Sequence, residues 1–336
     1  MFCDLRHLLL KKVGGIEMNK KNIKGTNIYK GTEVSLIVII VAIFLAATIG
    51  TDNFFTEYNL MNILKQCSII GVISISATFI IITGGIDLSC GSICGMSTLI
   101  VAMGQAKWGY SVSMSIILAL VVAILCGIYN AFIINEFKVA PFIATLGSMT
   151  ILRGLIKVIG NASTIAGLDK EFGAFASDSF LRIPKLAIIW AVIVIIAFLL
   201  LRYTTFGRNL YVLGSGQNVA RLCGISIRKV TYMTYGVAGF LCGIAGVMLA
   251  SRINSSVPTA GSGYEMNAIA ASVIGGASLS GAKGSVWGTA LGTILMTLID
   301  NAGIQFGINS FIMEISTGVL ITIAVIIDQL RSKKAK

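Results

Sequence analysis

The chain contains little charge, little proline and a single histidine. Of its 336 residues, 12% are charged and 56% are hydrophobic, and the mean hydropathy is +0.89. Soluble domains carry about 25% charged residues, so this scarcity of charge excludes an ordinary soluble protein. Only three prolines accompany 37 glycines, which favours helical spans in close contact over a β-barrel. The composition therefore predicts an all-α polytopic membrane protein.

Sequence patterns for metal binding, disulfide frameworks and nucleotide hydrolysis are missing as well. None of the seven cysteines belongs to a C-x-x-C pair with a histidine nearby, and His7 is the only histidine. We therefore expect small buried thiols and no metal site. The chain has no Walker A sequence and no catalytic cluster. We therefore expect that the chain is not an enzyme and holds no cofactor of its own.

Positive charge gathers in three places. Sixteen of the 26 lysines and arginines lie in residues 1–30, 202–229 and 331–336. Lysine and arginine near span ends stay on the cytoplasmic side. The three clusters thus predict a basic cytoplasmic segment over 1–33, a membrane domain over 34–330 with a cytoplasmic loop, and a basic cytoplasmic tail. They explain the net charge of +12 without a nucleic-acid partner.

The N-terminal segment has no signal-peptide pattern, because Leu8, Leu9 and Leu10 are too few for an apolar region. Met18 is followed by Asn-Lys-Lys and resembles a natural start more closely than Met1 does. We hypothesise that the native chain begins at Met18.

Ten segments are predicted to cross the membrane. A span needs about 20 apolar residues, and fewer where protein surrounds it. Residues 264–281 are only weakly apolar, but they are assigned as a crossing because the basic loop and the basic tail share one side. Lys107 is the one charge that fits this scheme poorly. The predicted spans are 34–50, 60–82, 89–104, 112–134, 141–159, 185–201, 230–250, 264–281, 286–298 and 311–327.

Some residues near these spans have simpler predicted roles. Asn59 is expected to cap the second span, and Arg153 and Lys157 are expected to extend outward to the interface. Small residues four positions apart indicate close packing between helices of this chain. These pairs are Gly91 and Gly95, Gly239 and Gly243, and Gly288 and Gly292.

The longest polar interruption covers residues 202–229. Within it, GQNVARLCGI at 216–225 predicts a short amphipathic helix that ends at Gly224, a residue suited to left-handed backbone. Ala220, Leu222 and Cys223 supply its apolar side. A compact cytoplasmic helix between spans is typical of a docking element, while the alternative is a basic loop that only fixes topology. The predicted coupling residues are Gly216, Gln217, Ala220, Arg221, Leu222 and Gly224.

Two acidic residues lie beside glycine-rich breaks in the spans. Asp87 follows Gly84-Gly85, and Glu265 follows GSG at 261–263. Charge inside a membrane usually faces a water-filled path or another charge, and irregular backbone is tolerated where it lines a cavity. The predicted path for a small polar solute includes Asp87, Ser89, Glu265 and Asn267. Alternatively, Asp87 or Ser89 caps the next helix, or Asp87 and Glu265 bind ions in a secondary transporter.

Several of these segments together resemble the ribose/xylose/galactose-type ABC transporter permease family. The match runs in order from about residue 34 to residue 330. The 216–225 segment also resembles the coupling helix of bacterial ABC importers, G-(E/Q)-x-x-A-x-x-L-G-(I/V), and departs from it at Cys223. The other matching segments are TGGIDLSCGS at 83–92, PFIATLG at 141–147, RYTTFGR at 202–208, AGSGYEMNAIAA at 260–271 and GGASLSG at 275–281, with Gly284 and Trp287.

This resemblance implies a permease subunit of a monosaccharide importer in the bacterial cytoplasmic membrane. It implies a helical arrangement similar to that of cobalamin-type ABC importer permeases. The implied partners are a cytoplasmic ABC ATPase that binds ATP and Mg²⁺, an extracytoplasmic sugar-binding protein, and a second permease subunit. The rival function is an ion-coupled secondary transporter, which needs no ATPase.

Overall fold

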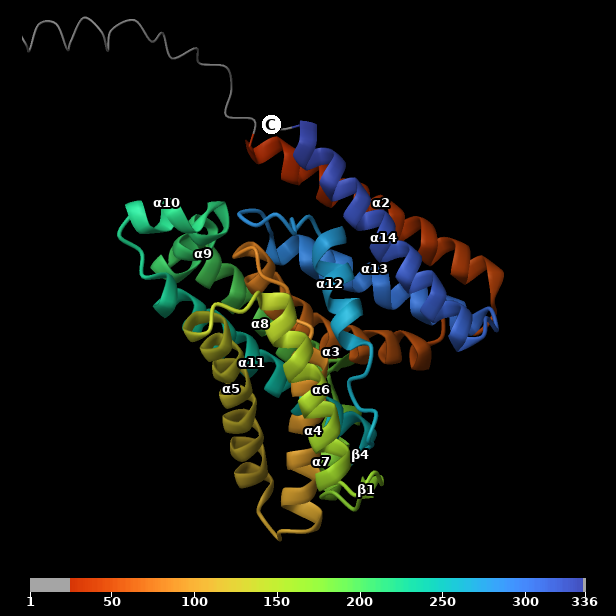
Figure 1. Ribbon diagram of the computed structural model, residues 1–336. Helices are drawn as coiled ribbons and strands as arrows, with labels where there is room; N and C mark the ends of the chain where they lie inside the picture. The colour runs from red at the N-terminus through yellow and green to blue at the C-terminus, as the bar shows by residue number, and fades with distance from the viewer. Residues whose placement is uncertain (1–24, 335–336) are drawn as a thin grey trace, which may run out of the picture.

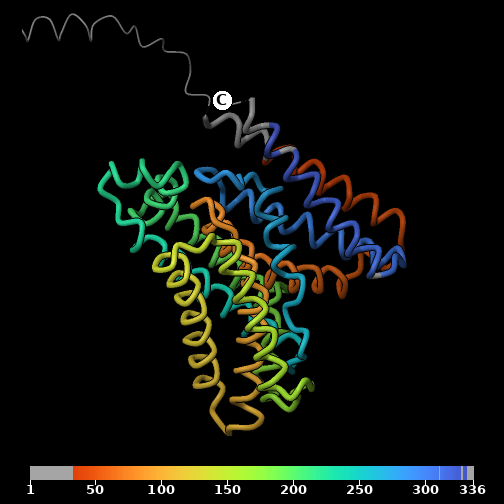
Figure 2. The backbone as a smooth tube through the Cα atoms, in the orientation of Figure 1, coloured from red at the N-terminus to blue at the C-terminus, as the bar shows by residue number. Residues whose placement is uncertain are grey.

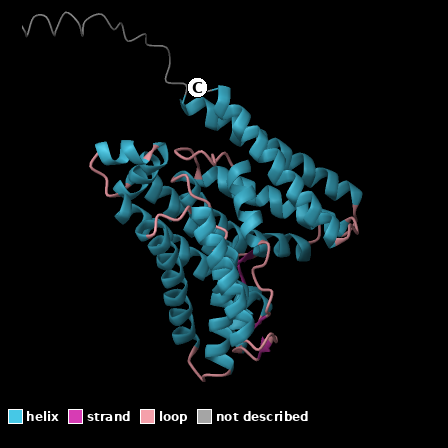
Figure 3. Ribbon diagram, viewed as in Figure 1, coloured by secondary structure: helices cyan, strands magenta, loops and turns pink. Residues whose placement is uncertain are grey.

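The computed structural model describes residues 25–334. Met18 and most of the basic N-terminal segment lie outside the described residues. The described part contains thirteen helices and four two-residue strands (Figures 1 and 3). The helices are α2 (Gly25–Gly50), α3 (Glu57–Ile82), α4 (Cys90–Ala106), α5 (Val112–Glu136), α6 (Pro141–Ile159), α7 (Lys170–Ser177), α8 (Lys185–Tyr203), α9 (Thr205–Ser215), α10 (Gln217–Leu222), α11 (Ile227–Ile253), α12 (Tyr264–Ile274), α13 (Val286–Gln305) and α14 (Ser310–Lys334). The strands are β1 (Ile165–Ala166), β2 (Ser179–Phe180), β3 (Ile183–Pro184) and β4 (Ser255–Ser256).

The helices are those of a membrane protein. Among the described residues, seven helices are long and apolar enough to cross a membrane, namely α2, α3, α5, α6, α8, α11 and α14. The apolar helix α4 is shorter. The prediction of an all-α polytopic membrane protein is therefore confirmed.

Helix α3 forms the centre of the bundle. In the most apolar 18-residue stretch of α3, 89% of the residues are buried, whereas in that of α2 only 11% are buried. Helix α3 is therefore surrounded by protein, and α2 presents its apolar residues outward. Helix α3 packs against α8, α11, α12 and α13, and α13 also contacts α2. Figure 2 shows α2, α13 and α14 running along one flank of the molecule.

The glycine pairs bring helix backbones together as expected. A side chain at Gly239 of α11 would meet the Ala123 carbonyl oxygen of α5, and one at Gly292 of α13 would meet the Ala271 carbonyl oxygen of α12. Gly91 and the other members of the three pairs likewise have atoms of neighbouring segments within contact distance. The predicted packing between helices of this chain is confirmed.

The paired strands β1 and β4 and the helices α9 and α10 lie at opposite ends of the bundle (Figure 1). One end carries β1 and β4, which pair antiparallel with Ile165 opposite Ser256. The other end carries α9 and α10. The segment after β4 reaches that second end, because the Tyr211 hydroxyl of α9 donates a hydrogen bond to the Gly284 carbonyl oxygen at 2.9 Å.

Several predicted boundaries need correction. Helix α12 has 11 residues, about 16 Å of helix at 1.5 Å per residue, so the predicted 264–281 segment is helical only in its first part. Helices α2, α11 and α13 are longer than predicted, because their polar ends continue the helix beyond the apolar run. The predicted cap at Asn59 was wrong. The cap is Thr56, which accepts from the Asn59 amide, while the buried Asn59 side chain exchanges hydrogen bonds with Asn301 at 2.9 Å.

Candidate translocation path and coupling loop

The break between α3 and α4 is held by one buried carboxylate. Helix α3 ends at Ile82, and Gly84 adopts a left-handed φ of 81°. Asp87 Oδ1 then accepts hydrogen bonds from the Ser89 amide at 2.7 Å and the Ser89 hydroxyl at 2.6 Å. Ser89 itself makes no side-chain capping bond at the start of α4. Asp87 therefore fixes the turn that precedes α4, acting on the residue at the cap position.

Ser89 begins a buried chain of polar groups that joins this break to α5 and α6. Asn130 Nδ2 of α5 donates to the Ser89 hydroxyl at 2.8 Å, and the Ser148 hydroxyl of α6 donates to Asn130 Oδ1 at 2.5 Å. All four side chains from Asp87 to Ser148 are at most 4% exposed. Buried polar groups that satisfy one another in this way hold helices in one arrangement.

A second contact holds the same break from α6. The Thr145 hydroxyl accepts a hydrogen bond from the Leu88 amide and approaches the Ile86 carbonyl oxygen, both at 3.2 Å. Sequence reasoning did not select Asn130, Thr145 or Ser148. Two sequence features could have pointed to them. Asn130 is an asparagine inside a highly apolar helix, and Thr145 belongs to the PFIATLG segment.

Glu265 belongs to a different contact, formed by α4, α6 and the turn before α12. The Arg153 guanidinium of α6 donates to the carbonyl oxygens of Ala260 at 2.6 Å and Gly261 at 2.7 Å. It also lies 3.7 Å from Glu265 Oε2. Gly91 of α4 leaves the space that this carboxylate occupies. The expectation that Arg153 extends outward to the interface was wrong, because three oxygens on the 260–265 turn hold it inside.

The four residues predicted for the path are thus not brought together as one group. Asp87 and Ser89 bond directly, while Glu265 pairs with Arg153. Asn267 lies half-buried on the first turn of α12. Among the described residues, no group of three or more His, Cys, Asp or Glu side chains could hold a metal ion.

The 202–229 loop contains two helices where one was predicted. Helix α10 occupies the predicted position, and Gly224 beyond it has a φ of 71°, as expected for a glycine that follows a helix end. The preceding helix α9 was missed. Its cap is Thr204, whose hydroxyl accepts from the Gly207 amide.

The exposed side of α10 differs from the prediction in one residue. Leu222 is 89% exposed, and Gln217 and Arg221 are also exposed. Ala220 is completely buried among other residues of this chain. Ala220 therefore packs α10 onto its own protein and cannot contact a partner, which corrects its predicted docking role.

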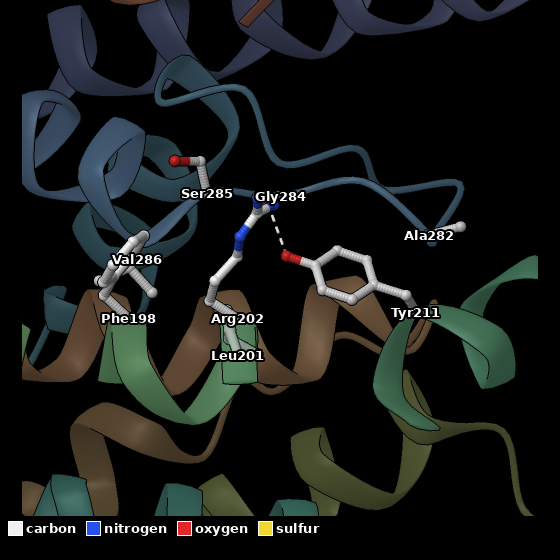
Figure 4. Close-up of a pocket in the computed structure, with 8 residues that line it drawn as sticks. All are labelled: Phe198, Leu201, Arg202, Tyr211, Ala282, Gly284, Ser285 and Val286. Atoms are coloured by element: carbon white, nitrogen blue, oxygen red, sulfur yellow. Dashed lines mark hydrogen bonds between the residues drawn. The ribbon is translucent and has the colours of Figure 1, made fainter. Parts of the chain in front are cut away.

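Helix α9 joins the loop to the end of α3. The Ala282 amide donates to the Ile82 carbonyl oxygen at 2.9 Å, and Gly214 of α9 lies directly against this pair. An added Cβ at Gly214 would lie 2.5 Å from the Ala282 nitrogen and closer still to the Ile82 oxygen. Figure 4 shows the neighbouring Tyr211 side chain of α9 directed at the 282–286 loop. We call Gly214, Ile82 and Ala282 the α9 junction. Its α3 member, Ile82, lies five residues before Asp87.

Comparison with known proteins agrees with this architecture. The model of a family described as "Branched-chain amino acid transport system / permease component" matches residues 59–327. The chain belongs to this family of ABC transporter permease subunits. Its members are membrane components and not enzymes, since ATP hydrolysis takes place in a separate ATPase subunit.

Curated relatives cover most of the chain. It is 39% identical over 299 residues to the ribose import permease protein RbsC of Bacillus subtilis (strain 168), covering 88% of this chain and 91% of the relative. It is 36% identical to the ribose import permease protein RbsC of Escherichia coli (strain K12), covering 88% and 92%. It is 32% identical to the fructose import permease protein FrcC of Rhizobium meliloti, covering 88% and 84%. No solved structure matches the chain.

Proposed function

We propose that this chain is the permease subunit of an ABC importer that carries a monosaccharide, a ribose-like pentose or a related sugar, into the cytoplasm. The observation that carries the proposal is the 39% and 36% identity to two ribose import permeases along 88% of the chain. The family description names branched-chain amino acids, so family membership alone leaves the substrate open. The sugar assignment rests on the individual relatives.

The buried break between α3 and α4 suits a neutral solute. Its groups are hydroxyls, an amide and backbone oxygens, and its one carboxylate, Asp87, already accepts two hydrogen bonds from Ser89. Glu265 is paired with Arg153. A cation bound at these carboxylates would have to compete with those donors, which argues against the ion-coupled alternative.

The proposed topology has ten crossings with both termini in the cytoplasm of a bacterial cell. Each of the ten predicted spans overlaps a helix among the described residues, although the 264–281 segment is helical only as far as Ile274. The chain between β4 and α13 supports a crossing there, because it leaves the end of the bundle that carries β1 and reaches the end that carries α9. The similarity to cobalamin-type permeases remains part of this proposal.

The proposed partners follow from this role. A cytoplasmic ABC ATPase, which binds ATP and Mg²⁺, docks on the exposed side of α10 at Gln217, Arg221 and Leu222, with Gly216 and Gly224 shaping the ends of the helix. An extracytoplasmic binding protein delivers the sugar at the opposite end. A second permease subunit completes the membrane domain, and lipid surrounds it.

The α9 junction provides a physical link between docking and transport. Closure of the ATPase on ATP moves α10 and α9, and α9 bears on Ile82 at the end of α3. Because the Asp87 break follows within five residues, movement of this end reaches the hydrogen bonds that join the break to α5 and α6.

Copurification tests the proposal. The chain is expressed in its native host and purified in a mild detergent through a tag on the permease. We expect the ATPase in the purified complex and a sugar as the ligand of the cognate binding protein. A binding protein that takes leucine and no sugar would contradict the substrate assignment, and a permease without any ATPase would contradict the importer.

A further inference from the structure

A cavity of about 450 Å³ lies beside the α9 junction. It is bounded by the last turns of α8, by Tyr211 of α9, and by the loop that leads into α13 (Figure 4). Its apolar wall consists of Phe198, Leu201 and Val286. Its polar side chains are Arg202, Tyr211 and Ser285. The Tyr211 hydroxyl is bonded to the Gly284 carbonyl oxygen, and the Ser285 hydroxyl accepts from the Gly288 amide, which leaves the Arg202 guanidinium for a ligand.

The charge of the cavity is positive. Arg202 is exposed and makes no hydrogen bond or ion pair with another described side chain. In Figure 4 its guanidinium extends from the end of α8 toward Gly284. Lys283 is exposed on the loop beside it. Among the described residues, no carboxylate lines the cavity; the Glu33 carboxylate lies just outside it and accepts a hydrogen bond from the Ser285 hydroxyl at 3.5 Å.

The cavity lies where α8 leaves the apolar part of the membrane. Arg202 directly follows a long apolar run of α8, whose outward residues include Ile195, Ile196 and Leu199. Tyr203 and Trp287 flank the cavity, 67% and 47% exposed, and both contact the Phe198 ring. Tyrosine and tryptophan are enriched at the level of lipid headgroups.

We propose that this cavity binds the phosphate headgroup of an anionic phospholipid from the surrounding leaflet. Arg202 pairs with the phosphate, the polar headgroup lies beside the backbone of the 282–284 loop, and an acyl chain follows the outward face of α8. Basic pockets between spans on the cytoplasmic side are suited to anionic headgroups. The proposal rests on the proposed cytoplasmic orientation of this end and is independent of which solute is carried.

The bound lipid touches three segments that the importer must move together. The end of α8, helix α9 and the 282–286 loop all contribute to the wall. The Tyr211–Gly284 hydrogen bond already joins two of them. A headgroup bound to Arg202 adds the third, so anionic lipid is expected to support coupling between the ATPase and the permease.

Lipid retention tests the site directly. The purified permease complex is loaded with an equimolar mixture of phosphatidylglycerol and phosphatidylcholine, and retained lipid is counted by native mass spectrometry. We expect phosphatidylglycerol to be retained in preference, and Arg202→Gln to reduce its retention about fivefold, the effect of about one membrane-surface charge. Arg202→Lys keeps the charge and should keep most of the lipid.

Arg208→Gln is the matched control, since Arg208 is an exposed arginine of the same loop that does not line the cavity. It should retain phosphatidylglycerol as the wild type does. Equal losses in the Arg202 and Arg208 variants would mean general attraction to a basic loop and would overturn the site. Unchanged retention in Arg202→Gln would overturn it as well.

A second arm separates a lipid headgroup from free phosphate. Excess inorganic phosphate should leave the retained phosphatidylglycerol in place, because phosphate lacks the acyl chain that lies along α8. Full displacement by inorganic phosphate would assign a soluble phosphate site and contradict the lipid. Neither arm measures sugar uptake, so failure here is distinguishable from failure of the importer assignment.

Discussion

The α9 junction leads to a quantitative prediction for Gly214→Ala. The added methyl group would lie 2.5 Å from the Ala282 nitrogen and closer to the Ile82 oxygen. Both are backbone atoms, so α9 or the end of α3 must move. Overpacking of this kind costs about 1–3 kcal/mol, while alanine returns up to about 1 kcal/mol of helix propensity relative to glycine. We expect the junction to weaken by roughly 1–2 kcal/mol, a factor of about 5–30 in its formed population.

The assay measures ATP hydrolysis and sugar uptake in the same proteoliposomes. Because α10 is unchanged, the Gly214 variant should still bind its ATPase and hydrolyse ATP, but the number of sugars carried per ATP should fall severalfold. Gly154→Ala adds the same methyl group on α6 where no atom lies within 4 Å, and it should behave as the wild type. A wild-type transport ratio in Gly214→Ala, or an equal fall in Gly154→Ala, would refute the role of the junction.

Three further predictions concern the break, the loop and the topology. Asp87→Asn keeps an acceptor for the Ser89 donors and should transport better than Asp87→Leu; near-zero uptake in the asparagine variant at normal membrane levels would favour ion coupling. The Gly224→Val protein should insert normally but lose ATPase association or uptake, because a β-branched residue resists the φ of 71°. Arg221→Ala should have only a mild effect on both, because a charge at the rim of an interface contributes little to affinity. Normal copurification and uptake by Gly224→Val would remove the loop from docking. Single cysteines at Lys283 and Ser163 should react from inside and outside respectively, and outside labelling at 283 would overturn the crossing before α13.

Sequence patterns were sufficient for the membrane class and for most helices. Long apolar runs determine where spans lie, and Pro141 begins α6 as its first helical residue, where proline fits best. Gly224 was also predictable, since glycine after a short helix usually adopts positive φ. These features depend on local chemistry and therefore appear in the sequence.

Contacts between distant segments were not predictable in the same way. Arg153 is held by carbonyl oxygens 107 and 108 residues away, and backbone oxygens have no sequence signature. Ala220 and Leu222 were assigned to one docking face, but residues two positions apart lie on nearly opposite sides of a helix, and the fold shows that the Ala220 side is buried and the Leu222 side is exposed. Helix α9 was missed because its polar residues made the segment resemble a loop.

The central claim is that ATP hydrolysis by a partner drives sugar through this chain. The most direct measurement is uptake of radiolabelled ribose by proteoliposomes that contain the permease with its ATPase, with binding protein supplied outside and ATP inside. We predict uptake that requires both ATP and the binding protein and that persists when ionophores collapse the proton and sodium gradients. Uptake that continues without ATP and stops when those gradients collapse would contradict the account.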